Sequence, residues 1–271
     1  MFNGVFDTEE TAEAWARGAA QRAQYLLGAT ERMLDEARLM PGSLVLDVGT
    51  GTGDTATLAA RRVGPKGFVL ATDASAQMLD AAARAAKSQG LANVEVRQMD
   101  GSQVVVDAPF DAIIGRNSMQ FLPNWPEPLT GFRAALRPEG RLSFLVWAPM
   151  ADNPYTALPI TVAIAGGWLG RDEASFSAPF SLGDAERLAS DLAVAGLRDG
   201  AAERIPFEVR LPRDAALANR MDSPMFSSIA NRLSDADRTA YKTAMGSAID
   251  RFKDGDSVIA RGMTIVASGT A

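Results

Sequence analysis

One stretch decides the fold of this 271-residue chain: Leu44-Val-Leu-Asp47-Val-Gly49-Thr-Gly51-Thr-Gly53-Asp54. Its first residues form a short apolar run, which is typical of a buried parallel strand. The alternating glycines predict a tight turn at which a ligand can approach the main chain, and Asp54 begins a predicted helix. The order of strand, glycine turn and helix therefore predicts a ligand site at the carboxyl end of this strand.

Strands and helices alternate along the chain beyond this turn. Further strands are predicted at residues 67–72, 93–98, 110–115, 141–147, 205–211 and 257–267, and helices at 54–63, 75–88, 124–136 and 184–195. Strict alternation in the first half indicates parallel strands with crossover helices on both faces. The predicted fold is α/β, a Rossmann-like, seven-stranded, mostly parallel sheet with helices on both faces and a helical cap built from insertions.

Two segments interrupt the alternation and are predicted to build that cap. Residues 149–182 are apolar and rich in proline, glycine and aromatic residues, and residues from about 213 to 252 have a helical pattern. Residues 1–40, helical from Thr8 to about Arg38 by their spacing, are expected to form an N-terminal lid. Residues 41–148 would be the cofactor-binding core, and residues 183–271 would complete the sheet and carry the second insertion.

Composition excludes several classes of function. The net charge is −6 and no run of Lys or Arg occurs, so nucleic acid is not an expected partner. Histidine and cysteine are both absent, which excludes His-based general bases, Ser-His-Asp triads, thiolate chemistry and disulfides. We expect no metal site, no signal peptide and no membrane span, because the start is acidic and the most apolar window is too short. The expected location is the cytoplasm.

The spacing of acidic residues around the glycines indicates the type of cofactor. Asp73 ends the second predicted strand about 20 residues after Gly53, where a carboxylate accepts hydrogen bonds from ribose hydroxyls. The glycine pattern is G-x-G-x-G, whereas dinucleotide sites normally show G-x-G-x-x-G. Asp47 lies two residues before Gly49, where it would repel a diphosphate but attract the sulfonium and α-amino group of S-adenosylmethionine (SAM).

Several further motifs follow in a fixed order. They are Ala71-Thr-Asp73-Ala-Ser-Ala-Gln-Met78-Leu79, Asp100-Gly101, Phe110-Asp111-Ala-Ile-Ile114 and Leu136-Arg-Pro-Glu-Gly140. Together with the glycine turn, these motifs resemble those of the class I SAM-dependent methyltransferases over about Leu44 to Trp147. The chain is most similar to the small-molecule branch that includes the ubiquinone and menaquinone biosynthesis enzymes.

The resemblance implies a set of cofactor-binding residues. They are Asp47 at the amino acid end, Gly49, Thr50, Gly51 and Gly53 along the backbone, Asp73 and Ala74 at the ribose, Met78 on the adenine face, Asp100, Gly101 and Ser102 at the adenine edge, and Arg116 and Asn117 at the methionine moiety. Structural roles stay open for some of them. Met78 is equally compatible with plain packing, Asp100 with a turn, and Arg116 with a surface ion pair.

The expected reaction is methyl transfer to a small, apolar or aromatic metabolite by O-, N- or C-methylation. Its rate would come mainly from positioning of the donor and acceptor. No catalytic residue is assigned, and Tyr155, just past the fifth strand, is the candidate if a base is needed. The bulky residues available for the acceptor pocket are Met119, Phe121, Tyr155, Trp168, Phe180, Met221, Met225 and Phe226.

Three alternatives stay open. A protein that binds SAM without transferring its methyl group would carry the same cofactor residues. A nicotinamide-dependent oxidoreductase is less favoured because of the glycine spacing. The chain could act as a monomer or as a homodimer.

Overall fold

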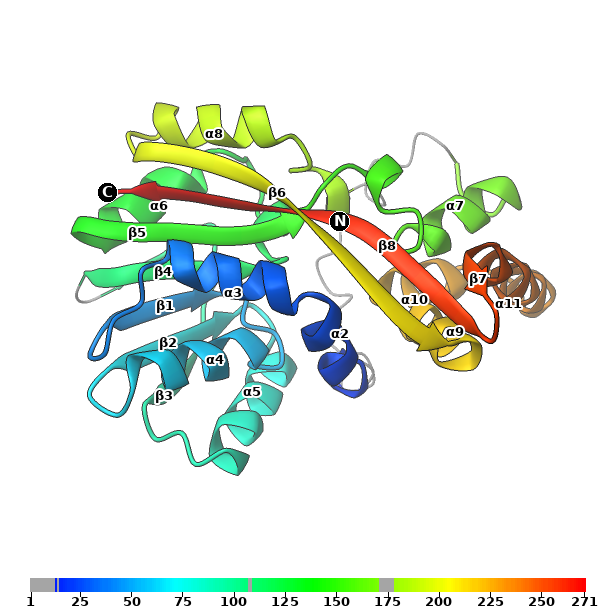
Figure 1. Ribbon diagram of the computed structural model, residues 1–271, viewed down its shortest axis with the longest axis horizontal. Helices are drawn as coiled ribbons and strands as arrows, with labels where there is room; N and C mark the ends of the chain where they lie inside the picture. Colours follow the sequence, from blue (N-terminus) through cyan, green and yellow to red (C-terminus); the bar gives the residue numbers. More distant parts are fainter. Residues whose placement is uncertain (1–12, 14, 107–108, 171–177) are drawn as a thin grey trace.

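A single mixed sheet organises the protein (Figure 1). The computed structural model describes residues 13, 15–106, 109–170 and 178–271. The strands are β1 (Leu44–Val48), β2 (Phe68–Asp73), β3 (Val94–Gln98), β4 (Phe110–Arg116), β5 (Leu136–Trp147), β6 (Arg198–Pro212), β7 (Lys253–Asp254) and β8 (Ser257–Thr270). Their order is β3-β2-β1-β4-β5-β8-β6, with β7 pairing β8. The pairs from β3 to β5 are parallel, whereas β8 is antiparallel to both β5 and β6. The predicted α/β fold with a mostly parallel sheet is confirmed.

Helices cover both faces of this sheet and also build a separate cap (Figure 1). The helices are α2 (Ala19–Tyr25), α3 (Leu27–Glu36), α4 (Asp54–Val63), α5 (Ala76–Ser88), α6 (Pro128–Ala135), α7 (Leu158–Ala165), α8 (Ala185–Val194), α9 (Arg213–Met221), α10 (Pro224–Ala230) and α11 (Asp235–Ile249). Short 3₁₀ turns lie at η1 (Met119–Phe121), η2 (Met150–Asp152), η4 (Ala178–Phe180) and η5 (Asp250–Phe252). No helix within the described ranges combines the length and apolarity needed to cross a membrane.

The alternation of side chains along β1 shows why its apolar run is continuous. Val45 belongs to the core cluster that contains residues of α3 and α4, while Leu46 and Val48 belong to the cluster that contains residues of α6 and α8. Successive side chains of a strand point to opposite faces, so a strand covered by helices on both sides is apolar at every position. β1 therefore lies in the middle of the sheet, between β2 and β4.

The cap is attached to a long antiparallel arm formed by β6 and β8 (Figure 1). These two strands pair from Arg198 opposite Thr270 as far as Pro212 opposite Ser257. The far end of the arm carries α9, α10 and α11, which pack together with α7. A third core cluster lies there and includes Phe207 and Val209 of β6.

The structure changes several predicted bounds. Thr8, the predicted start of the first helix, lies outside the described residues, and the described part breaks at Leu26 into α2 and α3. α6 begins only at Pro128, since Pro126 and Pro128 lack amide donors for a preceding turn. β6 begins at Arg198, earlier than predicted. The sequence did not indicate this start, because the first half of this edge strand is exposed and polar and has no apolar pattern. The helix α7 and the short β7 were not predicted.

The predicted division into four parts stays a proposal for the domain organisation. We propose it because β5 ends at Trp147, next to the expected boundary between residues 148 and 149, and because α9 begins at Arg213, where the second insertion was placed.

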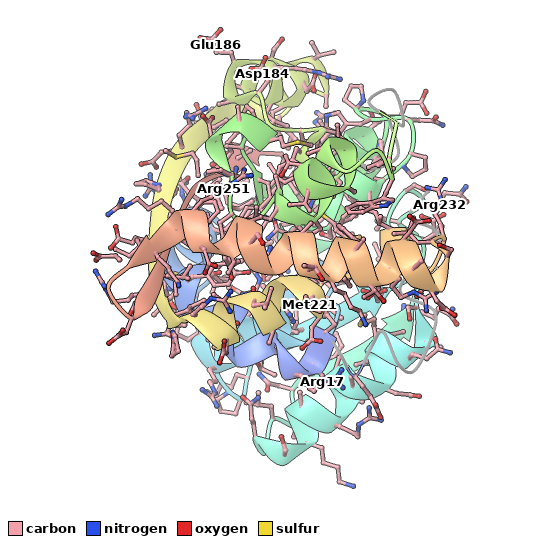
Figure 2. The ribbon with its side chains drawn as sticks, turned by 90° about the vertical axis from the view of Figure 1, so that its right-hand side faces the viewer. Arg17, Asp184, Glu186, Met221, Arg232 and Arg251 are labelled. Carbon is pink, nitrogen blue, oxygen red and sulfur yellow. The ribbon has the colours of Figure 1, made fainter. Side chains whose placement is uncertain are left out.

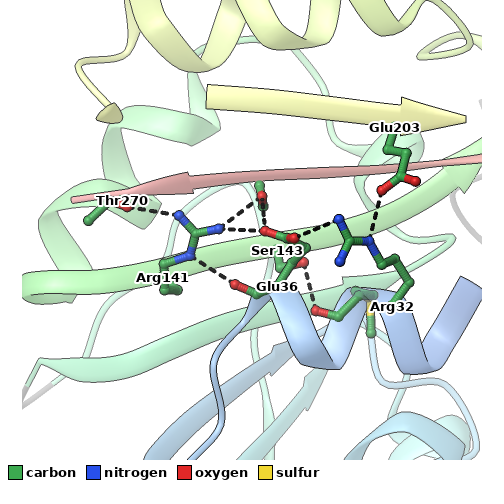
Figure 3. Close-up of polar contacts among 8 residues, drawn as sticks. Arg32, Glu36, Arg141, Ser143, Glu203 and Thr270 are labelled. Carbon is green, nitrogen blue, oxygen red and sulfur yellow. Dashed lines mark hydrogen bonds and ion pairs between the residues drawn. The ribbon is translucent and has the colours of Figure 1, made fainter. Parts of the chain in front are cut away.

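A buried arginine anchors the N-terminal helix α3 to the last strands of the sheet (Figure 3). Arg141 of β5 is 4% exposed and donates to the main-chain oxygen of Glu36 and to its carboxylate, both at 2.8 Å. It also donates to Thr270 Oγ1 at 2.8 Å and to Ser268 Oγ at 3.0 Å. Glu36 pairs in addition with Arg32, at 3.0 Å, near the surface. The buried positive charge of Arg141 is thus balanced by the Glu36 carboxylate, and its N–H groups have hydrogen-bond acceptors.

We expect Arg141→Met to lower the free energy of unfolding by about 3–5 kcal/mol, because it leaves Glu36 without its buried partner. Arg32→Met is the matched control: Arg32 contacts the same carboxylate but its side chain is 45% exposed, so its loss should cost under about 1 kcal/mol. Urea denaturation followed by circular dichroism measures both variants. Equal losses for the two would contradict this account of the anchor.

Candidate functional site

The glycine turn after β1 has a conformation that other residues could not adopt without strain. Gly49 has a φ of +68°, and a Cβ atom on it would lie 2.4 Å from the Cβ of Ser118. Gly53 has a φ of +86°, and a Cβ on it would lie 3.0 Å from the Cα of Ala82 in α5. Close approach of the main chain to neighbouring elements therefore requires glycine at both positions.

Asp47, the last but one residue of β1, is completely buried beside this turn. Its Oδ2 accepts a hydrogen bond from Thr50 Oγ1 at 2.7 Å, but its Oδ1 is buried without any partner in the described part of the chain. Burial raises the pKa of the carboxyl group to about 7, an effect that the Thr50 hydroxyl and the charge of Arg116 partly oppose. The charges of Asp73 and Asp54 raise this pKa further.

An unpaired buried carboxylate oxygen is costly unless a ligand binds it. A cationic ammonium group is the natural partner, since it supplies both the opposite charge and the hydrogen-bond donor. The geometry of Asp47 therefore suits the ammonium group of SAM, and its role in cofactor binding stays a prediction.

Asp73, at the end of β2, lies across the turn from Asp47. Its Oδ2 accepts from the amide of Gly51 and its Oδ1 from the amide of Ser75, both at 2.9 Å. Ser75 in turn caps α5 by accepting from the amide of Met78, which is 2% exposed in the first turn of that helix. Ala74, next to Asp73, is exposed. The ends of β1 and β2 and the start of α5 thus surround one region.

The predicted adenine-edge residues form a turn after β3. Asp100 Oδ1 accepts from the amide of Ser102 at 2.9 Å and from its hydroxyl at 2.8 Å, and Gly101 lies between them. Asp100 is exposed, so it has capacity for a further partner. Both the turn and a ligand contact are compatible with this geometry.

Arg116 is the last residue of β4, and Asn117 follows it at the same edge of the sheet. Arg116 pairs with Asp54 at the start of α4, 2.8 Å away, and both side chains are mostly buried, at 10% and 17% exposed. Asn117 has a φ of +54°, and its Oδ1 is buried with no partner in the described ranges. The ion pair of Arg116 is therefore interior. Like Asp47 Oδ1, the buried Oδ1 of Asn117 would be stabilised by a hydrogen-bond donor from a ligand.

Gln120 was not singled out from the sequence. It is 6% exposed in η1, and neither its Oε1 nor its Nε2 has a partner among the described residues. Its main-chain oxygen accepts from Ser181 Oγ at 3.2 Å, which ties η1 to the segment after η4. The only sequence signal was its place shortly after Asn117, and a glutamine there predicts nothing about burial.

Most of the predicted acceptor residues gather in the apolar cluster of the cap. These are Tyr155, Trp168, Phe180, Met221, Met225 and Phe226. Figure 2 shows Met221 on α9, beneath α11. Met119 belongs instead to the cluster between the sheet and α6 and α8, where it is completely buried, and Phe121 is half-buried in η1. The structure thus separates Met119 from the cap residues.

Tyr155 makes contacts of a structural kind. Its hydroxyl donates to the main-chain oxygen of Ala216 at 3.0 Å, and its ring lies edge-on to Phe252. Burial raises the pKa of this phenol, so that it is neutral over the ordinary range of pH. Its proton is thus already engaged with α9, which does not favour Tyr155 as a general base.

No group of three or more acidic residues able to hold a metal ion occurs in the described portion of the chain.

Comparison with known proteins places this geometry in a family. Residues 45–140 match the methyltransferase domain family. Nocamycin O-methyltransferase of Saccharothrix syringae is 35% identical over 124 residues, which are 45% of this chain and 44% of that protein. The ubiquinone/menaquinone biosynthesis C-methyltransferase UbiE of Methylococcus capsulatus is 33% identical over 122 residues, or 44% of this chain and 49% of that protein. Residues 45–140 thus form a methyltransferase domain that is similar to those of the class I SAM-dependent methyltransferases.

The similarity in fold extends beyond the methyltransferase domain. The YcgJ protein of Bacillus subtilis superimposes with a TM-score of 0.58 at 19% identity, covering 90% of this chain and 97% of that structure. The chain spans about half the length of the curated relatives it matches, and the match lies in the domain that carries the glycine turn. The predicted family and its cofactor are confirmed, and the cap is the part that this similarity leaves without an assigned role.

The buried carboxyl group of Asp47 predicts a pH-dependent stability. Its pKa in the folded protein is about 7, above its ordinary value of 3.8, so the folded state holds an extra proton between these values. The free energy of unfolding therefore falls as the pH rises through this interval. In Asp47→Asn this slope should be missing, so that the variant gains on the order of a few kcal/mol relative to the wild type between pH 4 and pH 8. Parallel curves of stability against pH for the two proteins, from chemical denaturation without ligand, would refute it.

Proposed function

We propose that this protein transfers the methyl group of SAM to a small apolar or aromatic metabolite. The observation that carries the proposal is the buried Asp47, with one oxygen that has no partner among the described residues, directly before the glycine turn of a methyltransferase domain. SAM supplies a methyl group on a positively charged sulfur, which makes the methyl carbon electrophilic.

The donor would be held by residues at the carboxyl ends of β1, β2 and β4. Asp47 Oδ1 would accept from the ammonium group, while the glycine turn would let the cofactor approach the main chain. Asp73 would hold the ribose, with Ala74 beside it. The remaining cofactor-binding residues proposed from the sequence are Thr50, Met78, Asp100, Gly101, Ser102, Arg116 and Asn117.

The acceptor would bind between these strand ends and the cap. The cap cluster offers aromatic rings and methionines, a surface that suits apolar or aromatic ligands. Since Tyr155 is engaged with α9 and the sequence has no histidine or cysteine, catalysis would consist mainly of holding donor and acceptor in line and excluding water. An acceptor that is a free amine, a phenol or an enol needs no strong base.

Calorimetric titration with S-adenosylhomocysteine tests the donor side. We expect Asp47→Asn to weaken binding about 10- to 100-fold at pH 8, the loss of one charged hydrogen bond of about 1.5–3 kcal/mol. The wild-type affinity should also fall as the pH drops below about 7, because Asp47 then takes up a proton, and this dependence should vanish in the variant. Asp80→Asn, which removes an exposed carboxylate of α5, is the control and should bind normally.

Two further measurements separate this proposal from its rivals. Methyl-labelled SAM incubated with phenolic, enolic and amine metabolites should pass its label to an acceptor. Tight SAM binding with no transfer to any of these would favour a protein that uses SAM without methylating. Titration with NAD should produce no heat, and NAD binding in place of S-adenosylhomocysteine would overturn the proposal.

A further inference from the structure

Two arginines near the proposed site are buried without a carboxylate partner. Arg22 of α2 is 8% exposed and Arg220 of α9 is 5% exposed. Arg22 donates to the main-chain oxygen of Trp15 and stacks over its ring, with 3.6 Å from the guanidinium carbon to the ring centre. Arg220 donates to Asn219 Oδ1 and to the main-chain oxygen of Thr156. Within the described ranges, neither forms an ion pair.

Arg141 shows how this fold treats a buried arginine that only stabilises structure. Its guanidinium is as deeply buried, yet it meets the carboxylate of Glu36 at 2.8 Å and two hydroxyl groups. Burial of a cation without such a partner is costly. Arg22 and Arg220 keep that cost in the ligand-free protein.

The two guanidinium groups lie near the two parts of the proposed site, the glycine turn for the methyl donor and the cap for the methyl acceptor. The ring of Trp15, on which Arg22 stacks, reaches the glycine turn: its Nε1 is 3.5 Å from the place of a Cβ on Gly51. Arg220 stacks over Tyr155 of the cap at 4.7 Å. A hydrogen bond from Asn219 to Gln21 joins α9 directly to α2, and Figure 2 shows the first helix lying beside α9.

The charges in this region are unbalanced. Burial lowers the pKa of Arg22 to about 10, and the nearby positive charges of Arg116 and Arg220 act in the same direction. Asp54 is the acid that opposes them, but it is already paired with Arg116 at 2.8 Å. An added anion would thus relieve both the desolvation and the mutual repulsion of the guanidinium groups.

We propose that Arg220 binds a carboxylate, with Arg22 adding positive charge nearby, and that the methyl acceptor supplies the carboxylate. The inference rests on the proposed function and narrows its substrate class to apolar or aromatic carboxylic acids. A planar guanidinium binds a carboxylate through two parallel hydrogen bonds, which a neutral amide cannot match. The site would therefore fix the orientation of the acceptor as well as its charge.

The carboxylate of SAM is the other source of this chemistry. In SAM the carboxylate and the ammonium share one carbon, so a cofactor whose ammonium meets Asp47 holds its carboxylate near Asp47 too. Arg116 is the cation whose charge acts on Asp47, and it lies next to Asn117 at the end of β4. Arg220, on the cap beside Tyr155, fits the acceptor better than the donor.

The experiment uses the full chain saturated with S-adenosylhomocysteine and two probes of equal shape, 2-naphthoate and 2-naphthamide. We expect the wild type to bind the acid at least tenfold more tightly than the amide. Arg220→Met should abolish this preference, and Arg220→Lys, which keeps the charge but not the fork, should retain part of it. Arg213→Met is the matched control on the same helix, because Arg213 is paired with Asp250, and it should leave the preference unchanged.

The affinity for S-adenosylhomocysteine shows whether Arg220 binds the carboxylate of the acceptor or that of the cofactor. It should change less than about twofold in Arg220→Met. A large loss for S-adenosylhomocysteine but not for its decarboxylated analogue would assign the arginine to the cofactor and overturn the proposal. Equal affinity of the wild type for acid and amide would also overturn it, whatever the variants do, while normal cofactor binding in that case would leave the proposed function standing. Failure of the wild type to bind S-adenosylhomocysteine would instead refute the proposed function.

Discussion

A carboxyl group held inside the protein at the end of the central strand is the constraint on which the site depends. β1 lies between β2 and β4 and is covered by helices on both faces, and the side chain of Asp47 is completely buried. Among the described residues, only one of its oxygens finds a partner, the Thr50 hydroxyl. The fold thereby maintains an interior group that a positively charged ligand would stabilise, and the glycine turn leaves the main chain accessible beside it.

The long arm of β6 and β8 carries the cap, where we propose that the methyl acceptor binds. The two strands leave the sheet together and carry the cap helices, which hold each other through contacts such as Tyr241 Oη donating to the main-chain oxygen of Pro159 and Phe226 stacking on Tyr241. The hydrogen bond between Asn219 and Gln21 connects this unit to the first helix. Gln21 and Asn219, whose separation in the sequence is 198 positions, thus meet between α2 and α9.

Buried arginines serve two different purposes in this molecule. Arg141 has its counter-charge and hydroxyl partners within the fold, so its role is complete without a ligand. Arg22 and Arg220 stack on aromatic rings and contact neutral oxygens, and neither forms an ion pair within the described ranges. The difference lies in what each guanidinium contacts, since all three are buried to a similar degree.

The sequence by itself determined the sheet, its cofactor turn and the family. Apolar strands, alternating glycines and the carboxylates Asp47 and Asp73 are local sequence patterns. They can be interpreted from backbone conformation and hydrophobic periodicity alone, which depend on neighbouring residues. The early starts of β5 and β6, the cap helix α7 and the burial of Gln120, Arg22 and Arg220 were decided only by the tertiary structure. Polar residues carry no signal of burial, because their surroundings come from elements far away in the chain. Whether a buried arginine meets a carboxylate or only neutral oxygens depends on where those elements pack.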